Sequence, residues 1–169
     1  ISRIVADKLA ARLGQPIVVD NRGGANGIVG SEIVARAIPD GHTLLVVPAG
    51  FAVNPSLKKQ MPYDTQRDLA PIGILGDSFY VMVIPAGIPA NTLKDFIAWA
   101  KARPGQLNYA STGTGALTHL AAELFKIMAG VDMAHIPYKG GGALMPDLLA
   151  GRVVAFFGTM PTVGPQVRS

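Results

Sequence analysis

Cysteine is absent from the 169 residues, which excludes disulfide bonds, zinc sites built on thiolates and catalysis by a thiol. Charged residues are scarce as well, at 15% of the chain, and the formal net charge of +4 is scattered. No run of basic residues with interleaved aromatics occurs, so a small anionic ligand is easier to support than a nucleic acid. No apolar run approaches the roughly 20 residues that span a bilayer.

Motifs typical of enzymes are also missing. There is no G-x-S-x-G elbow and no H-E-x-x-H pair, and the acidic residues occur singly in expected turns and on helix surfaces. The histidines, His42, His119 and His135, do not have the spacing of a zinc site. The sequence therefore predicts no catalytic residue, no metal site and no cofactor.

Hydrophobic residues make up 49% of the chain, and their periodicity alternates between helices and short strands. The first half predicts an N-terminal helix, a helix over 31–37 and short strands at 15–20, 43–47, 70–76 and 78–87. The second half predicts strands at 107–111, 133–137 and 153–157, and helices at 116–129, at 143–150 and from Pro161. This alternation indicates an α/β fold of parallel sheets covered by helices on both faces.

A proline- and glycine-rich stretch near 85–90 is the expected hinge between two lobes, residues 1–84 and residues 85–169. Asn91 or Thr92 is the expected N-cap of the helix that follows. The chain begins at Ile1 inside a helical pattern and ends at Ser169 after about one helical turn. We therefore expect a fragment of a longer protein.

The stretch "NYASTGTGALTHLAAELF", residues 108–125, predicts a strand, a loop of glycine and hydroxyl residues, and a helix. Unpaired N–H groups and the positive end of the helix dipole make such a loop an anion site, and a carboxylate fits it. A phosphate-binding P-loop would need a lysine, which is absent between Lys101 and Lys126, and the third glycine of a dinucleotide fingerprint is missing. Simple helix capping remains the alternative.

Three side chains near the expected loops have two interpretations each. His119, in the helix after the loop, is either a packed structural histidine or a ligand contact. Tyr138 either lines a pocket or covers one, and Lys139 either places a cation near the cleft or is simply exposed.

Long segments of the sequence resemble the Bug family, the extracytoplasmic solute-binding receptors of tripartite tricarboxylate transporters. These segments are "PIVVDNRGGANGIVGSEIVARAIPDGHTLL", "NPSLKKQMPYDTQRDLAPI" and "ARPGQLNYASTGTGALTHLAAELFKIMAGVDMAHIPYKGGGALMPDLLAGRV". The resemblance implies a periplasmic binding protein of type II, the two-lobed Venus flytrap fold, here truncated at both ends. It also implies a periplasmic receptor, not an enzyme, that closes around a small organic carboxylate and passes it to membrane transporter subunits.

The resemblance also implies which residues contact the ligand. In the second lobe these are Ser111, Thr112, Gly113, Thr114, Gly115, Thr118 and His119, with Tyr138 beside them. In the first lobe the loop around Ala49 and Gly50 is expected to face the cleft. The chain has Ala116, Gly50 and Gly158-Thr159 where the family often has more polar residues, which favours a less polar or aromatic acid.

Two other functions are compatible with the residues alone. One is an α/β enzyme or sensor domain that binds a phosphorylated small molecule at the same loop. The other is self-association through the edges and apolar faces that a truncated sheet leaves bare.

Overall fold

The structure is a computed structural model that describes residues 2–167, so Ile1, Arg168 and Ser169 lie outside the described residues. The chain divides into two compact units, Ile1–Ala70 (unit 1) and Pro71–Ser169 (unit 2). This division differs from the expected one between residues 84 and 85. The reason is that strand β1, Tyr80–Val83, pairs with a strand of unit 2 and belongs to its sheet.

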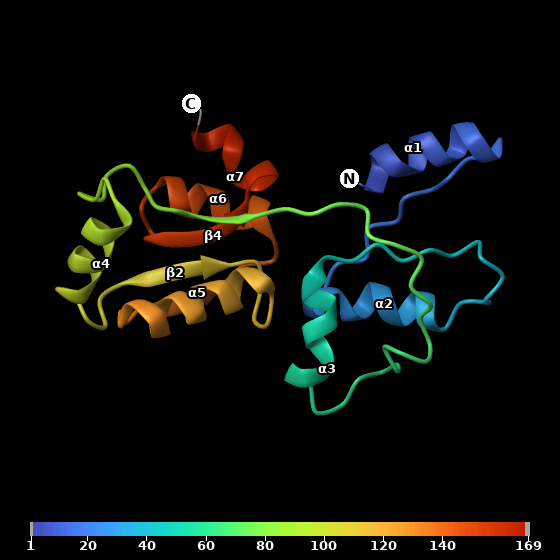
Figure 1. Cartoon of the computed structure of the whole chain (residues 1–169), viewed down its shortest axis with the longest axis horizontal. Helices are drawn as coiled ribbons and strands as arrows, with labels where there is room; N and C mark the ends of the chain where they lie inside the picture. Colours follow the sequence, from blue (N-terminus) through green and yellow to red (C-terminus); the bar gives the residue numbers. More distant parts are fainter. Residues whose placement is uncertain (1, 168–169) are drawn as a thin grey trace. The chain divides into compact units, whose positions relative to one another are not determined.

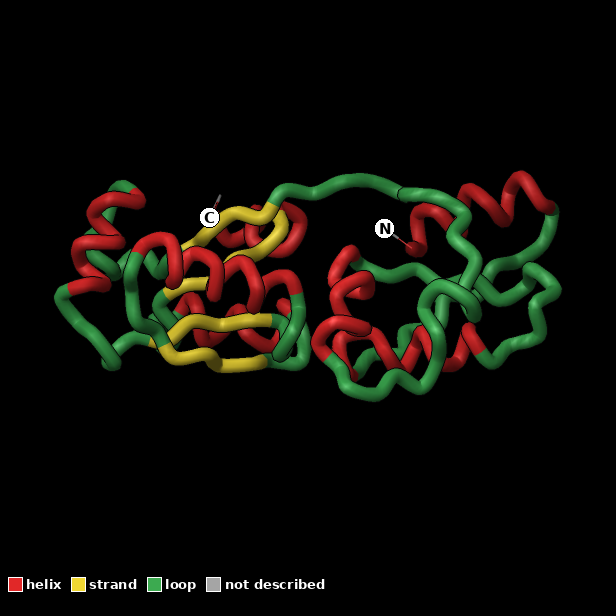
Figure 2. Tube along the Cα trace, turned by 60° about the horizontal axis from the view of Figure 1, so that its bottom comes forward, coloured by secondary structure: helices red, strands yellow, loops and turns green. Residues whose placement is uncertain are grey.

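Unit 1 consists of short helices joined by extended segments. Its elements are α1 (Ser2–Leu13), the 3-10 turn η1 (Ala25–Gly27), α2 (Ile28–Ala35), the 3-10 turn η2 (Ala49–Val53) and α3 (Asn54–Leu57). Figure 2 shows this unit as helices and loops. The strands expected at 15–20 and 43–47 are not formed, because no described segment pairs with them. Val18, expected in a buried strand, is instead 88% exposed.

Unit 2 contains a four-stranded sheet of order β1-β4-β2-β3. In chain order, β1 is followed by α4 (Leu93–Lys101), β2 (Asn108–Ser111), α5 (Leu117–Ala129), β3 (Ala134–Pro137), α6 (Gly141–Leu149), β4 (Ala155–Thr159) and α7 (Met160–Val167). The predicted strands and helices of the second half are thus confirmed, within about two residues at most ends. The strand expected at 70–76 is absent, and β1 runs antiparallel to β4, whereas the prediction had parallel sheets only.

The two faces of the sheet bury different side chains because successive residues of a strand point to opposite faces. One face carries Tyr109, Met133 and Ala155, which pack against residues of α4 and α5 such as Phe96 and Ala122. Ala110 and Phe156, on the other face, pack against residues of α6 and α7, among them Leu144 and Val163. Figure 1 shows α5 running alongside β2, with α6 and α7 near β4.

Helix α4 begins with the N-cap that the sequence indicates. Thr92 Oγ1 accepts a hydrogen bond from the Asp95 N–H at 3.1 Å, and Asp95 Oδ2 accepts one from the Thr92 N–H at 3.0 Å. This reciprocal capping box satisfies two of the N–H groups left open at a helix start. Of the helices in the described part of the chain, none has the length and apolar character to cross a membrane.

Strands β2, β3 and β4 run parallel, so they all end at the same edge of the sheet. The helices that follow them, α5, α6 and α7, therefore begin at this edge. A Cβ added to Gly141, the first residue of α6, would lie 2.7 Å from the Thr162 side chain in the first turn of α7. The fold thus gathers three helix N-termini at one edge, which is where α/β sheets bind their ligands.

Candidate ligand-binding site

The β2–α5 loop (residues 112–116) is held by the hydroxyls on either side of it. Thr118 Oγ1 accepts a hydrogen bond from the Thr112 N–H at 2.9 Å and lies 3.0 Å from Thr112 Oγ1. Ser111 Oγ lies 3.1 Å from both the N and the O of Gly113, so it bonds the loop backbone two residues ahead. Ser111 and Thr118 are buried, so these hydroxyls shape the loop from inside.

The turn itself depends on glycine. Gly113 has φ 133° and Gly115 has φ 82°, both in the region that L side chains rarely adopt. Between them Thr114 is exposed, and Thr112 is partly exposed. The loop therefore reaches the surface at Thr114, whereas Gly115 is buried.

Several N–H groups at the start of α5 have no acceptor among the described residues: those of Thr114, Leu117 and Thr118. The N-cap of α5 is Ala116, whose side chain makes no capping bond. The sequence left simple capping as the alternative for these hydroxyls, and the structure shows that none of them caps α5 in the usual way. An anion at this position would meet open donors and the positive end of the helix dipole.

His119 and His135 lie together beneath the loop, although they are 16 residues apart in the sequence. Their ring centroids are 4.1 Å apart, and the His135 ring stacks on Tyr109 at 5.1 Å. His119 Nδ1 accepts a hydrogen bond from the Gly115 N–H at 3.3 Å. His135 Nε2 lies 2.6 Å from Ser111 Oγ. His119 thus has a structural contact with the loop, and His135, which the sequence analysis did not select, has one too.

Charged groups of α5 complete this cluster. Tyr109 donates a hydrogen bond to Glu123 at 2.5 Å, and Lys126 donates one to the same carboxylate at 2.9 Å. The Tyr109 hydroxyl, and then Lys126, lower the pKa of Glu123. Burial lowers the pKa of His135, and the neighbouring His119 adds to this effect.

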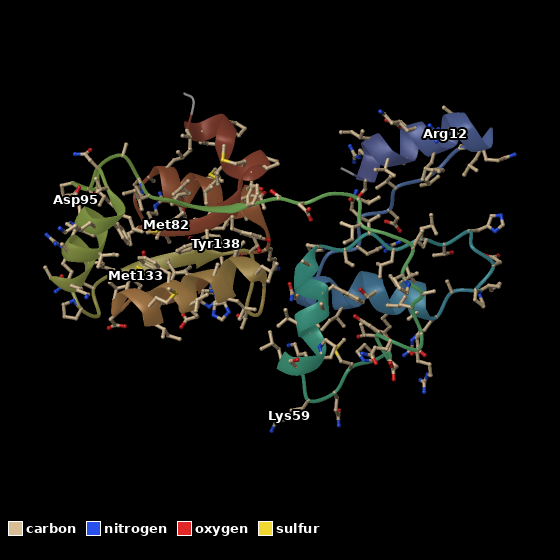
Figure 3. The ribbon with its side chains drawn as sticks, in the orientation of Figure 1. Arg12, Lys59, Met82, Asp95, Met133 and Tyr138 are labelled. Carbon is tan, nitrogen blue, oxygen red and sulfur yellow. The ribbon has the colours of Figure 1, made fainter. Side chains whose placement is uncertain are left out.

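Tyr138 connects the ends of two strands. Its N–H donates to the Ser111 carbonyl at 2.9 Å, and its hydroxyl donates to Asp147 of α6 at 2.6 Å. This hydrogen bond raises the pKa of Tyr138. Arg152 also donates to Asp147, at 2.6 Å. Figure 3 labels Tyr138 and Met133, which flank β3 at its two ends. Tyr138 is thus anchored to α6, and its role of lining or covering a pocket stays a prediction.

The predicted contacts of the first lobe, Ala49 and Gly50, form the start of η2 in unit 1. Gly50 is buried, and its carbonyl accepts a long hydrogen bond of 3.5 Å from the Asn26 side chain. Asn26 also donates to Asn54 Oδ1 at 2.7 Å, and Asn54 Nδ2 donates back to the Asn26 carbonyl at 3.1 Å. Asn54 is 1% exposed, and the sequence analysis did not select it. The asparagine pair thus connects η1 to the start of α3, and Asn26 also contacts η2 through Gly50.

The Ser111–His135 contact has the spacing of a nucleophile and its base, yet the geometry does not favour catalysis. Ser111 is fully buried, and no carboxylate of residues 2–167 bonds the other ring nitrogen of His135. Nor do any three His, Asp or Glu side chains in this range come together as a metal site.

Two surface hollows lie in unit 1. They share Met61, Tyr63 and Asp64, and neither is lined by a residue of β2 or α5. The second hollow includes Pro55 and Ser56 of α3, a helix of four residues. We place the candidate site at the β2–α5 loop because the N–H groups of Thr114, Leu117 and Thr118 are open there.

Comparisons with known proteins identify the family of the chain. The model of the tripartite tricarboxylate transporter family receptor matches residues 1–169. Protein BugT of Bordetella pertussis is 40% identical over 171 residues, which cover 100% of this chain and 52% of that protein. The chain spans about half the length of the curated relatives it matches.

Solved structures are similar over nearly the whole chain. R. palustris Rpa4515 with adipate has a TM-score of 0.94 and 32% identity, with 99% of this chain and 56% of that chain covered. MatC from Rhodopseudomonas palustris with bound malate has a TM-score of 0.88 and 27% identity, with 99% and 57% covered. Such neighbours confirm the α/β fold of periplasmic binding proteins. Because the family model covers every residue, the chain belongs to the tripartite tricarboxylate transporter family of receptors.

Proposed function

We propose that the protein is an extracytoplasmic receptor that captures a small organic carboxylate for a tripartite tricarboxylate transporter. The observation that carries the proposal is the β2–α5 loop, where the N–H groups of Thr114, Leu117 and Thr118 are open at the start of a helix. Two similar proteins were solved with the dicarboxylates adipate and malate. Family membership supports a periplasmic location and delivery to membrane subunits.

In this proposal the carboxylate lies against Thr112, Gly113, Thr114 and Gly115, and Ser111, Thr118 and His119 hold the loop from beneath. The loop around Ala49 and Gly50 in unit 1 would supply contacts from the first lobe. The receptor would bind without chemistry, by closure of two lobes on the ligand. The positive dipole ends of α6 and α7 at the same sheet edge would add to the attraction for an anion.

Titration calorimetry of the full-length protein tests the proposal. The panel should contain dicarboxylates and tricarboxylates, acidic amino acids and aromatic acids, with adipate and malate included. Saturable binding to at least one acid is expected, and the Thr118→Val variant should weaken it about tenfold because the Thr112 N–H loses its acceptor. Thr43→Val, at an exposed position in unit 1, is the control. No saturable binding to any acid would refute the proposal.

A further inference from the structure

We infer that His135 is a positioning residue for the β2–α5 loop and acts through the hydroxyl of Ser111. The inference rests on the proposed function of this loop for its effect on binding, but the geometry beneath the loop is independent of any ligand. His135 Nε2 is 2.6 Å from Ser111 Oγ, and Ser111 Oγ is in turn 3.1 Å from the N and the O of Gly113. The His135 imidazole thus contacts the backbone of Gly113 indirectly, through the hydroxyl of Ser111.

Counting donors and acceptors assigns the proton. A serine hydroxyl has one proton to donate and two lone pairs that accept. The Gly113 N–H can only donate to Ser111, and the Gly113 carbonyl can only accept from it. All three contacts of Ser111 Oγ are made together only when the remaining partner, His135 Nε2, also donates. Nε2 of His135 therefore carries a proton.

The fold fixes the His135 ring in place. The parallel register pairs Tyr109 of β2 with His135 of β3, so both side chains point to the face that α5 covers. The ring stacks on Tyr109 and lies against His119, and Glu123 and Lys126 of α5 are the charged groups nearest to it. A ring held on two sides gives its Nε2–H one direction, which is toward Ser111.

Two imidazoles thus hold the loop at two points. His135 acts on Gly113 through Ser111, and His119 accepts the Gly115 N–H directly. Gly113 and Gly115 have positive φ and no side chains of their own to fix the turn. Without the His135 donor, the Ser111 hydroxyl is free to rotate away from the Gly113 N–H. The open donors of the loop would then lose their common orientation, and a carboxylate would bind more weakly.

A pair of variants of the full-length protein separates this role from simple packing. His135→Leu keeps bulk but removes the donor, and His135→Gln keeps an N–H near the position of Nε2. We expect His135→Leu to weaken binding of adipate or malate about tenfold and His135→Gln to restore most of it. His42→Leu is the control, because the His42 side chain is 88% exposed in unit 1. Equal losses in the leucine and glutamine variants would overturn the positioning role.

Two further measurements do not need a ligand. Long-range ¹⁵N–¹H correlation spectra of the wild type should show the Nε2–H tautomer of His135, and the Nδ1–H tautomer would overturn the inference. Amide hydrogen exchange at Gly113 should accelerate at least tenfold in His135→Leu but not in His135→Gln or His42→Leu, and unchanged exchange would also overturn it. If the wild type binds no acid at all, the proposed function fails, while these two measurements still decide the role of His135.

Discussion

The two units use similar sequence patterns with different results. Both contain short β-branched or aliphatic runs next to glycine-rich loops and amphipathic helices. Among residues 2–167, unit 2 buries sixteen hydrophobic residues and forms a sheet with a core on each face, whereas unit 1 buries three, Ala6, Ile28 and Tyr63. A strand needs a neighbour for its N–H and C=O groups, and the described part of unit 1 offers none to 15–20 or 43–47.

Buried hydroxyl groups show the same contrast. In unit 1 the Tyr63 hydroxyl and Thr65 Oγ1 are buried without a hydrogen-bond partner among the described residues. In unit 2 the buried hydroxyls of Tyr109, Ser111 and Thr118 all have partners, and these partners shape the candidate site. Asn108 Oδ1 in β2 is also buried without a partner among the described residues, so the contrast holds for the hydroxyl groups and not for every polar atom.

The largest effect should come from matched truncations in the two units. Phe156→Ala, at a position 1% exposed in unit 2, should cost about 3–5 kcal/mol of unfolding free energy, because it leaves a cavity between the sheet and α6. Val18→Ala, 88% exposed in unit 1, should change it by less than about 0.5 kcal/mol. Denaturant titrations measure the free energy of unfolding of both variants. Trp99 fluorescence reports on unit 2, and circular dichroism reports on both units. An equal loss of unfolding free energy in Phe156→Ala and Val18→Ala would contradict the difference in core packing between the two units.

Added volume should sharpen the contrast within unit 2 itself. A Cβ at Gly158 of β4 would lie 2.7 Å from the Val163 side chain and also meet the Phe156 ring. Gly158→Ala should therefore cost about 1–3 kcal/mol, as overpacking does in filled cores. Gly73→Ala is the matched control, since nothing lies within 4 Å of its Cβ and Gly73 is not at positive φ. The same denaturant titration applies, and a neutral Gly158→Ala would show that β4 and α7 are not closely packed.

Sequence patterns predicted most of unit 2 because its signals are local. The glycines after 111 and the apolar period after 116 bounded α5 within one residue, and Thr92 was one of two predicted caps. The direction of β1 was not predictable, because pairing with β4 across more than 70 residues leaves no local signal. His135 was missed for a related reason, since only the β2–β3 register brings it to Ser111.

A smaller effect should follow from the cap of α4. Thr92→Ala removes the acceptor of the Asp95 N–H and should cost about 1 kcal/mol. Thr43→Ala, at an exposed position of unit 1 outside any helix, is the control and should be neutral. Thermal or denaturant unfolding read by Trp99, which lies in α4, detects the difference. An unchanged Thr92→Ala would indicate that tertiary packing alone fixes the start of α4.

The smallest effect concerns two acid clusters. The pKa of Glu123 is lowered by Tyr109 and Lys126, and that of Asp68 in unit 1 by the Asp64 N–H and Arg67. A carboxyl group with a lowered folded pKa stabilises the fold above its unfolded pKa of about 4 and loses this contribution as pH falls through the folded value.

Glu123 bonds the buried Tyr109 hydroxyl, whereas the Arg67 partner of Asp68 is exposed and screened by solvent. The wild type should therefore lose stability between about pH 5 and pH 3, and Glu123→Gln should flatten this dependence more than Asp68→Asn does. Denaturation midpoints across this range measure it. If Asp68→Asn flattened the pH dependence more than Glu123→Gln does, the interactions of Glu123 beneath the candidate site would not be the stronger of the two.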